Sequence, residues 1–337
     1  MAFVAVAACA FGVCLSAEPP GESRGMGGGR SGSVRLIVSD EGGVSCQNLA
    51  YPAHHLDGLD LSQEPPGARP ITMQAHRGMG REMPENTLET FRACWRLGGI
   101  PEGDLRTSKD GVILFLHDNT LARTTDARAA WRGLSTSDLT WEELRRVDAG
   151  VKQGERFRGQ RIPSGDEVFA EMAKDRRRRL YLDFKAGDLK AIAALVRKHG
   201  VAGQCLPCSR HYKEVAEASG LLPEAIGMVW IPLPEANVRR TVEFLAGKGF
   251  KGVRQIQIHT RVKREGKGIR FDPSFATLSW AREVTGKAGV KMEMLIAEDV
   301  PEAYGAMILL GVDSFATDLP TRTLGYIRAY QAEFAGR

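Results

Sequence analysis

Residues 71–98 read ITMQAHRGMGREMPENTLETFRACWRLG and contain one complete strand-and-helix unit. The apolar run Ile71–Ala75 predicts a short buried strand. The spacing Asn86-x-x-Glu89 is that of a capping box, and it precedes a helix with one apolar stripe that Gly98 ends. A strand that leads through a polar turn into a helix is the repeating unit of proteins with a parallel sheet.

The same alternation continues along the rest of the chain. Two more capping boxes, Thr140-x-x-Glu143 and Ser164-x-x-Glu167, mark later helices. Further strands are expected at 114–117, 180–184, 204–209, 225–230, 252–259, 290–295 and 314–317. Alternation over about 260 residues predicts an α/β fold of the TIM (β/α)₈ barrel type. A doubly wound open sheet is the alternative, but no glycine-rich phosphate loop follows a strand.

The overall composition excludes several classes of protein. The 337 residues include 46 Lys and Arg against 41 Asp and Glu, a formal net charge of +5, with 43% hydrophobic and 26% charged residues. These values are typical of globular proteins and exclude disordered and fibrous chains. No apolar run reaches the roughly 18 residues that a membrane span needs, so no stable membrane insertion is expected. The basic excess is too small and scattered to indicate a nucleic-acid partner.

The N-terminal part differs from the rest. Residues 1–17 form an apolar stretch with a small-residue cleavage site, which predicts a signal peptide. The protein is then exported, to the periplasm or the extracellular space; without a genuine signal it is cytoplasmic. Residues 18–69, rich in Gly, Ser, Arg and Pro, predict a flexible linker or irregular extension with one strand at 34–38. The barrel is expected to occupy 70–337.

Polar residues occur at the ends of several predicted strands. Glu102 and Asp104 are two apart on an extended segment, so their side chains point to the same face. Asp183 and Lys185 alternate within an otherwise apolar strand, where burial costs several kcal/mol unless the charges are paired or bind a metal. His117 ends an apolar run. Because active sites of TIM barrels lie at the C-terminal ends of the strands, these residues predict one shared site.

These residues and their neighbours resemble the signature of the glycerophosphodiester phosphodiesterase family. The order and spacing agree from Ala75 to Pro320. The matching segments are His76-Arg77-Gly78, Pro84-Glu85-Asn86-Thr87, Glu102-x-Asp104, Lys109-Asp110-Gly111, His117-Asp118, Thr120-Leu-x-Arg-Thr-Thr125, Arg161-Ile-Pro163, Asp183-x-Lys185 and Gly311-Val-Asp-x-x-x-Thr-Asp318-x-Pro320. The resemblance implies a TIM barrel, a divalent metal, and hydrolysis of small-molecule glycerophosphodiesters to sn-glycerol 3-phosphate and an alcohol.

The carboxylates are the expected metal ligands. Glu102, Asp104 and Asp183 offer hard oxygen donors, which suit Ca²⁺ or Mg²⁺ rather than zinc. The sequence does not separate these two ions. The metal would polarise a phosphate oxygen.

Two histidines are the expected general acid and base. Imidazole titrates near neutral pH, so His76 and His117 can exchange the two protons that hydrolysis moves. Either ring could act first as the base, and the attacking group is either the neighbouring glycerol hydroxyl, through a cyclic phosphate, or water. Arg77 and Lys185 are expected to bind the phosphate, unless they serve as buried ion-pair partners of barrel carboxylates.

The sequence departs from the family pattern at several positions. Asp183 stands where the family more often has Glu, and the segment 290–298 lacks the seventh-strand Trp that lines the pocket in many members. The alcohol is therefore left open, and Glu293 is a candidate for this part of the pocket. Asp318 is expected to have a structural role. His259 follows a strand and could reach the site, but is assigned no role.

Two other functions fit the same barrel. One is a phospholipase of the phosphoinositide-cleaving or sphingomyelinase D type, which an exposed apolar rim would favour. The other is a noncatalytic protein that captures phosphorylated polyols, which loss of a histidine or a metal ligand would indicate. The sequence has no obvious amphipathic insertion helix, and it keeps both histidines and all the expected metal ligands.

Overall fold

The computed structural model of the chain describes residues 35–38, 43–47, 51–52, 60–265 and 268–335. The predicted signal peptide and most of the predicted linker lie outside these residues.

Eight parallel strands form a closed ring, because each pairs with two neighbours and the last of them, β12, pairs with the first, β3. The predicted TIM barrel is therefore confirmed. In ring order its strands are β3 (Thr72–Ala75), β4 (Ile100–Thr107), β6 (Leu180–Ala186), β7 (Cys205–Ser209), β8 (Met228–Ile231), β9 (Gln255–Glu265), β11 (Lys291–Ile296) and β12 (Ser314–Thr317).

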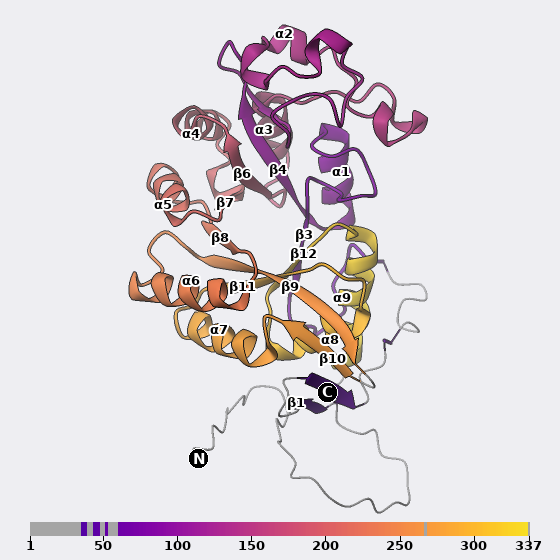
Figure 1. Cartoon of the computed structure of the whole chain (residues 1–337), viewed down its shortest axis with the longest axis vertical. Coiled ribbons are helices and arrows are strands. Elements are labelled where there is room, and N and C mark those ends of the chain that lie inside the picture. The colour runs from indigo at the N-terminus through magenta and orange to yellow at the C-terminus, as the bar shows by residue number, and fades with distance from the viewer. Residues whose placement is uncertain (1–34, 39–42, 48–50, 53–59, 266–267, 336–337) are drawn as a thin grey trace, which may run out of the picture.

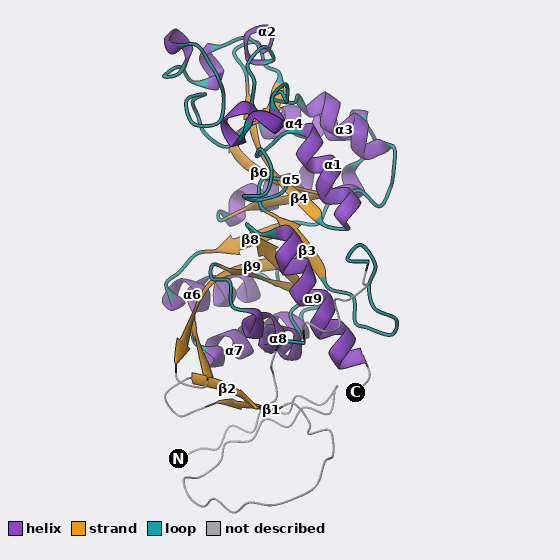
Figure 2. Cartoon of the chain, turned by 90° about the vertical axis from the view of Figure 1, so that its right-hand side faces the viewer, coloured by secondary structure: helices purple, strands orange, loops and turns teal. Residues whose placement is uncertain are grey.

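Helices cover the outside of the ring (Figures 1 and 2). In Figure 1, α4 to α7 follow one another along one side of the strands, and α1 and α9 lie on the other side. The helices that follow the barrel strands are α1 (Leu88–Leu97), α3 (Gly165–Ala173), α4 (Leu189–Lys198), α5 (Tyr212–Leu221), α6 (Glu235–Gly247), α7 (Phe275–Lys287), α8 (Pro301–Leu310) and α9 (Pro320–Ala335). Among the described residues, no helix combines the length and apolar character that crossing a membrane requires.

One predicted barrel strand is wrong. The apolar run at 114–117 forms β5 (Ile113–Phe115), which pairs antiparallel with β4 and lies outside the ring. The second barrel strand is β4, whose sequence IPEGDLRT contains Pro, Gly and two acids and does not look like a buried strand. Gly103 permits this hairpin, because a Cβ there would lie 2.6 Å from the ring of Phe115.

The capping boxes are confirmed at two of the three predicted positions. Thr140 and Ser164 each begin a helix with the reciprocal hydrogen bonds of a capping box, α2 (Trp141–Leu144) in the first case. At α1 the prediction is wrong by one residue: Thr87, not Asn86, is the N-cap, and its hydroxyl accepts from the backbone N–H of Thr90. The side chain of Asn86 instead makes two hydrogen bonds with Asp104.

The segment between β5 and α3 forms a small insertion that includes α2. It has its own apolar cluster, in which Leu121, Leu144 and Ile162 are almost fully buried. In Figure 1 the insertion lies at the top of the molecule, above β4, α1 and α3. The insertion therefore has a small hydrophobic core of its own, and its polar residues can lie beside the barrel mouth.

Part of the predicted linker is ordered against the barrel. The expected strand is present as β1 (Arg35–Val38), which pairs with a further strand β2 (Gly43–Gln47). β2 pairs in turn with β10 (Gly268–Asp272), the antiparallel partner of the long strand β9. Nearer the barrel, the guanidinium of Arg69 donates to the Val312 carbonyl oxygen at 2.6 Å. The domain boundary at residue 70 stays a prediction.

A network of hydrogen-bonded polar side chains fills part of the barrel interior. The Glu293 carboxylate is fully buried and accepts hydrogen bonds from the hydroxyls of Tyr181 and Ser314, at 3.0 and 2.5 Å, and from the amide of Gln257 at 2.6 Å. Gln255 donates to the Tyr181 oxygen at 2.8 Å. Every carboxylate oxygen is thus paired, which is the condition for burying such a group. Glu293 belongs to the core, and the hypothesis that it lines the substrate pocket is wrong.

The two cysteines with redox spacing are buried free thiols. Cys205 and Cys208 lie on β7, and burial raises the pKa of both. Reactive redox cysteines have a lowered pKa and partial exposure, and neither thiol has these properties.

Candidate active site

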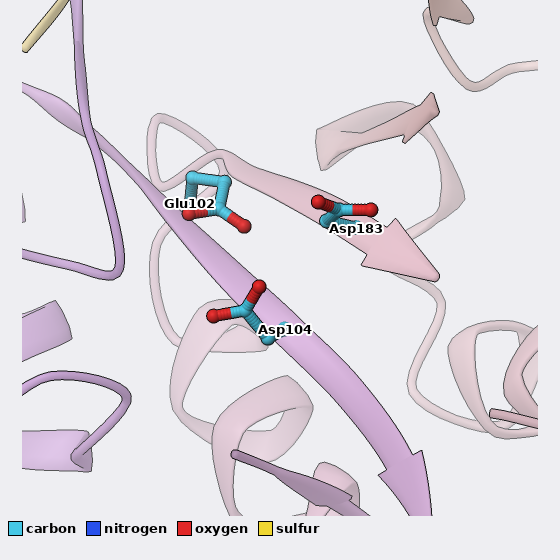
Figure 3. Close-up of side chains that lie close together, drawn as sticks. All are labelled: Glu102, Asp104 and Asp183. Atoms are coloured by element: carbon cyan, nitrogen blue, oxygen red, sulfur yellow. The ribbon is translucent and has the colours of Figure 1, made fainter. Parts of the chain in front are cut away.

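Three carboxylates from two neighbouring strands meet at the C-terminal end of the barrel. Glu102 and Asp104 lie on β4, and Asp183 lies opposite Asp104 in the register of β6. One oxygen of each lies within 4.8 Å of the others, and Figure 3 shows the three groups turned toward a common space. The alternation on β4 places both of its acids on the interior face, as predicted.

Two of these three carboxylates have a buried oxygen that accepts no hydrogen bond, Glu102 Oε1 and Asp104 Oδ1. Asp104 Oδ1 does have an ion-pair contact with the Lys185 ammonium, at 3.3 Å. Burial, then the charge of Asp104, raises the pKa of Glu102 to about 8, and burial raises the pKa of Asp183. Buried anionic oxygens without partners are costly unless a cation satisfies them. The donor set therefore fits a hard divalent cation such as Ca²⁺ or Mg²⁺.

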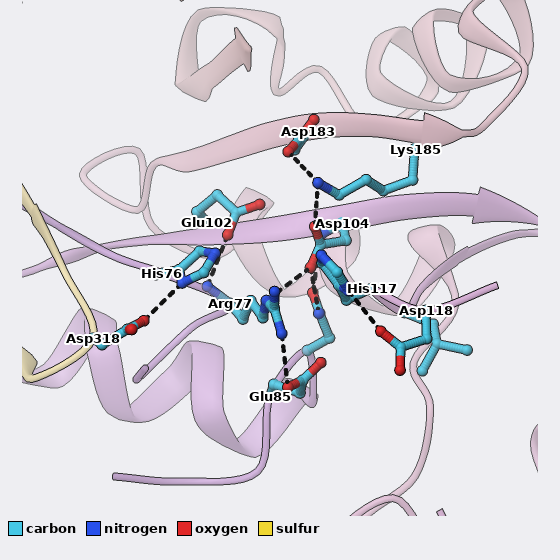
Figure 4. Close-up of polar contacts among 12 residues, drawn as sticks. His76, Arg77, Glu85, Glu102, Asp104, His117, Asp118, Asp183, Lys185 and Asp318 are labelled. Atoms are coloured by element: carbon cyan, nitrogen blue, oxygen red, sulfur yellow. Dashed lines mark hydrogen bonds and ion pairs between the residues drawn. The ribbon is translucent and has the colours of Figure 1, made fainter. Parts of the chain in front are cut away.

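Lys185 supplies a positive charge beside the acids. Its ammonium lies 2.7 Å from Asp183 Oδ2 and 3.3 Å from Asp104 Oδ1 (Figure 4). Burial acts to lower the pKa of Lys185, but the charges of these two acids outweigh it and raise the pKa. Lys185 is thus a permanent cation at the edge of the carboxylate cluster.

His76 is held by an acid from the last barrel strand. Its Nδ1 lies 2.7 Å from Asp318 Oδ1. The hydrogen bond from His76 lowers the pKa of Asp318, so this carboxylate is ionised and can only accept. Nδ1 therefore carries the proton, and Nε2 is left to exchange protons. Burial acts to lower the pKa of His76, but Asp318 and then Glu102 outweigh it and raise the pKa.

Gly80 makes this hydrogen bond sterically possible. Its φ of 56° lies in the left-handed region, and a Cβ there would lie 2.2 Å from the Asp318 carbonyl oxygen. The backbone N–H of Arg81 donates to the same carbonyl at 2.8 Å. The turn after His76 therefore packs directly on the backbone of Asp318.

His117 is held in the same way by its neighbour. Its Nδ1 lies 2.7 Å from Asp118 Oδ1. Hydrogen bonds from Arg123, which lies in the insertion, lower the pKa of Asp118, so Asp118 also accepts the Nδ1 proton. Arg123 donates to both oxygens of Glu85 as well, each at 2.7 Å. The insertion thus contributes to the orientation of His117.

Arg77 lies next to the acids in a strained backbone conformation. Its φ is 52°, and its backbone N–H donates to Glu102 Oε2 at 2.8 Å. Its guanidinium donates to Glu85 Oε2 at 3.2 Å, and Nε lies 3.9 Å from Asp104 Oδ2. Nε is buried and has no hydrogen-bond partner. Arg77 can therefore act as an ion-pair partner and still offer one donor to an anion.

Asn86 fixes Asp104. Its side-chain amide donates to Asp104 Oδ2 at 2.7 Å, and its carbonyl oxygen accepts from the Asp104 backbone N–H at 2.9 Å. Asn86 has φ 59°, a conformation that Asn tolerates better than most residues. This use of the side chain explains why Asn86 does not cap α1.

The structure brings together all seven residues predicted for the site (Figure 4). The structure also shows contacts that the sequence did not predict. Asp318, expected to be structural, binds His76 directly, while Glu85, Asn86 and Arg123 support the other polar groups. These residues occur in the segments that resemble the family signature, so the sequence marked their positions. It did not indicate which groups they contact.

Comparison with known proteins agrees with this arrangement. Residues 76–205 match the model of the glycerophosphoryl diester phosphodiesterase family. This part of the chain is similar in sequence to that family. A glycerophosphodiester phosphodiesterase of Caldanaerobacter subterraneus subsp. tengcongensis is 40% identical over 115 residues, which cover 34% of this chain and 44% of the relative. Human glycerophosphodiester phosphodiesterase 1 is 32% identical over 132 residues, 38% of each chain. The matches thus span less than half the length of these relatives.

Solved structures of the family extend the likeness to most of the fold. A glycerophosphodiester phosphodiesterase from Agrobacterium tumefaciens superposes with a TM-score of 0.61 and 23% identity, over 75% of this chain and 99% of that one. An Oleispira antarctica phosphodiesterase, in complex with the product sn-glycerol-3-phosphate, has a TM-score of 0.58 and 23% identity, over 76% and 96% of the two chains. At these identities the likeness establishes the shared barrel.

Proposed function

We propose that the protein hydrolyses glycerophosphodiesters to sn-glycerol 3-phosphate and an alcohol, using a divalent cation. The observation that carries this proposal is the convergence of two imidazoles, each bound to an acid, on a cluster of three carboxylates at the barrel mouth. Two of these carboxylates have a buried oxygen without a hydrogen bond. The match of residues 76–205 to the glycerophosphoryl diester phosphodiesterase family supports the reaction class. The product bound in the Oleispira antarctica neighbour supports a small phosphorylated substrate.

The substrate is an anion that gains negative charge on its nonbridging oxygens during attack. Glu102, Asp104 and Asp183 would hold the cation, which supplies positive charge to those oxygens. Lys185 adds a fixed positive charge beside the same space. Arg77 offers its unpaired Nε–H as a hydrogen-bond donor. Donors that are already in place stabilise the transition state without reorganisation.

The two histidines exchange the protons. In each ring Nδ1 donates to a carboxylate, Asp318 or Asp118, so Nε2 is the reactive nitrogen. One Nε2 removes the proton from the nucleophile, and the other protonates the oxygen of the departing alcohol. The nucleophile is either water or the adjacent glycerol hydroxyl. Detection of a cyclic glycerol phosphate in a single turnover would identify the second route.

One assay tests the proposal. Purified protein is incubated with glycerophosphocholine and glycerophosphoethanolamine, and glycerol 3-phosphate is measured with a coupled enzyme, with and without EDTA. We expect product that EDTA abolishes and that Ca²⁺ or Mg²⁺ restores. Turnover that EDTA does not affect would contradict the metal assignment. No turnover of any glycerophosphodiester under metal-replete conditions would refute the proposed reaction.

A further inference from the structure

The charged residues of the candidate site gather in one half of the barrel mouth, the charged half, and an aromatic pair lies in the opposite, aromatic half. His76 and the carboxylates come from β3, β4 and β6, whereas in the ring β8 lies opposite β3 and β9 lies opposite β4. On these opposite strands the inward-facing residues at the mouth are aromatic, Trp230 and His259. The charged half accounts for the phosphate and the proton transfers, but the mechanism gives the aromatic half no task.

The positions of these aromatic residues follow from the strand pattern. Gln255 and Gln257 reach Tyr181 and Gln74 across the barrel interior, at 2.8 and 2.7 Å, so alternate residues of β9 face inward. His259 is the next inward residue toward the C-terminal end of the strand. Trp230 stacks on its ring, with centroids 5.3 Å apart and planes 7° from parallel. Both side chains are only partly buried.

The stack carries no charge at neutral pH. Gln257 uses its amide nitrogen to donate to Gln74 and Glu293, so its oxygen accepts from Nε2–H of His259 at 3.1 Å. Burial, then the charge of nearby His76, lowers the pKa of His259 to about 4. A neutral imidazole does not repel a cation, and it leaves the electron-rich indole face of Trp230 as the dominant feature of this half.

We propose that the Trp230–His259 stack binds the alcohol group of the substrate and favours a cationic alkylammonium alcohol, such as choline, over a polyol. This inference rests on the proposed diesterase function. With the phosphate at the carboxylates, the glycerol hydroxyls find hydrogen-bond partners in the charged half. The other substituent then lies over the aromatic stack. A trimethylammonium group gains a cation–π contact there, whereas polyol hydroxyls would lose their hydrogen bonds to water without replacement.

The test compares diesters that share one product. Glycerol 3-phosphate release is measured for the choline, ethanolamine, inositol and glycerol diesters, and for the 3,3-dimethylbutyl diester, a neutral isostere of the choline compound. We expect the highest kcat/KM for glycerophosphocholine, with the isostere about tenfold lower, the scale of a desolvated cation–π contact. Trp230→Ala should lose about tenfold on the choline diester and much less on the glycerol diester, whereas Trp230→Phe should keep most of the preference.

A matched control removes a tryptophan elsewhere. Trp131→Ala changes a Trp of the insertion, which stacks with Arg128, and should leave the substrate ranking unchanged. Equal rates for choline diester and isostere, or an equal loss on all diesters in both Trp230 variants, would overturn the inference. The first comparison uses the wild type and holds even if Trp230→Ala fails to fold. Failure of the wild type on every diester would instead refute the proposed function.

Discussion

Arg123 donates to both carboxylate oxygens of Asp118, at 2.7 Å from Nε and 2.9 Å from Nη2. Asp118 in turn holds Nδ1 of His117. A guanidinium that grips a carboxylate through two parallel hydrogen bonds restricts its orientation as well as its charge. Because Arg123 also binds Glu85, the partner of Arg77, one side chain of the insertion supports polar groups on two sides of the site.

We predict that Arg123→Gln lowers kcat by about tenfold or more, because small displacements of a proton-transfer group are costly. If Arg123 acts through His117, the double variant with His117→Ala should be no slower than His117→Ala alone. Steady-state kinetics of the single and double variants checks this. Arg146→Ala removes an exposed arginine of the same insertion, paired with Glu142, and should keep full activity. Additive losses in the double variant would show that Arg123 does not act through His117.

Asp318→Asn should move the alkaline limit of the His76 proton exchange to lower pH. Asp318 stabilises the charged imidazole, so its neutral replacement lowers the pKa of His76, while the amide oxygen can still accept from Nδ1. NMR titration of the His76 ring and the pH profile of kcat/KM measure this shift. The exposed Arg81 pairs with Asp318 at 3.5 Å without touching His76, and Arg81→Ala provides the control. An unchanged His76 titration in Asp318→Asn would contradict the assigned contact.

His76→Ala and His117→Ala should each lower kcat by about 10² or more, the usual scale for loss of a general acid or base. Thermal unfolding should show that both variants remain folded, since both rings are partly exposed. His199→Ala removes a histidine that pairs with Asp166 and serves as the control. Wild-type rates in either site variant would refute the role assigned to that ring.

Removal of divalent cations should destabilise the protein more at high pH than at low pH. The folded pKa of Glu102, about 8 without metal, lies above its ordinary value of 4.5, so the metal-free folded state binds the extra proton. Its stability therefore falls as pH rises from about 5 to 8. A cation present at 100 times its Kd adds about 2.7 kcal/mol to the free energy of unfolding. Thermal melts with EDTA and with Mg²⁺ or Ca²⁺ should diverge with increasing pH; parallel curves would count against the site.

Asn86→Ala should lower the free energy of unfolding by about 1–3 kcal/mol, because the buried Asp104 N–H loses its acceptor. The left-handed backbone at residue 86 adds strain for Ala. Urea denaturation of the metal-free protein measures the change. Asn86→Gly keeps the backbone conformation without the side chain, so it separates these two effects. No loss of stability in either variant would show that the Asn86–Asp104 contact is dispensable.

The order of strands and helices was predictable because most barrel strands are short runs rich in apolar residues that alternate with helix-period segments. β4 was recognised only as an extended segment, because its two acids, Pro and Gly are untypical of a buried strand. Its acids are buried beside Asp183 and Lys185 of the neighbouring strand β6, which the local sequence does not reveal. The adjacent run that became β5 is more apolar yet lies outside the ring. Local hydrophobicity alone would therefore choose β5, instead of β4, as the barrel strand.

The site residues were predictable by type, but their partners were not. Asn86 and Thr87 are both good capping residues, and the choice between them depends on Asp104, 18 residues away. Asp318 lies 242 residues from His76, and nothing in its own segment indicates an imidazole partner. Contacts across the ring are fixed by closure of the barrel, and a linear pattern does not contain them.

The seam between β3 and β12, where the ring closes, also carries the His76–Asp318 hydrogen bond and the tight contact at Gly80. A nascent chain that has emerged only as far as β11 possesses both imidazoles and all three carboxylates of the proposed metal site, yet lacks the acid that sets the His76 tautomer. Catalytic competence should therefore arise late, when the final strand docks, and half-barrel fragments should be inert. Diester turnover would then serve as a sensor of completed assembly during refolding.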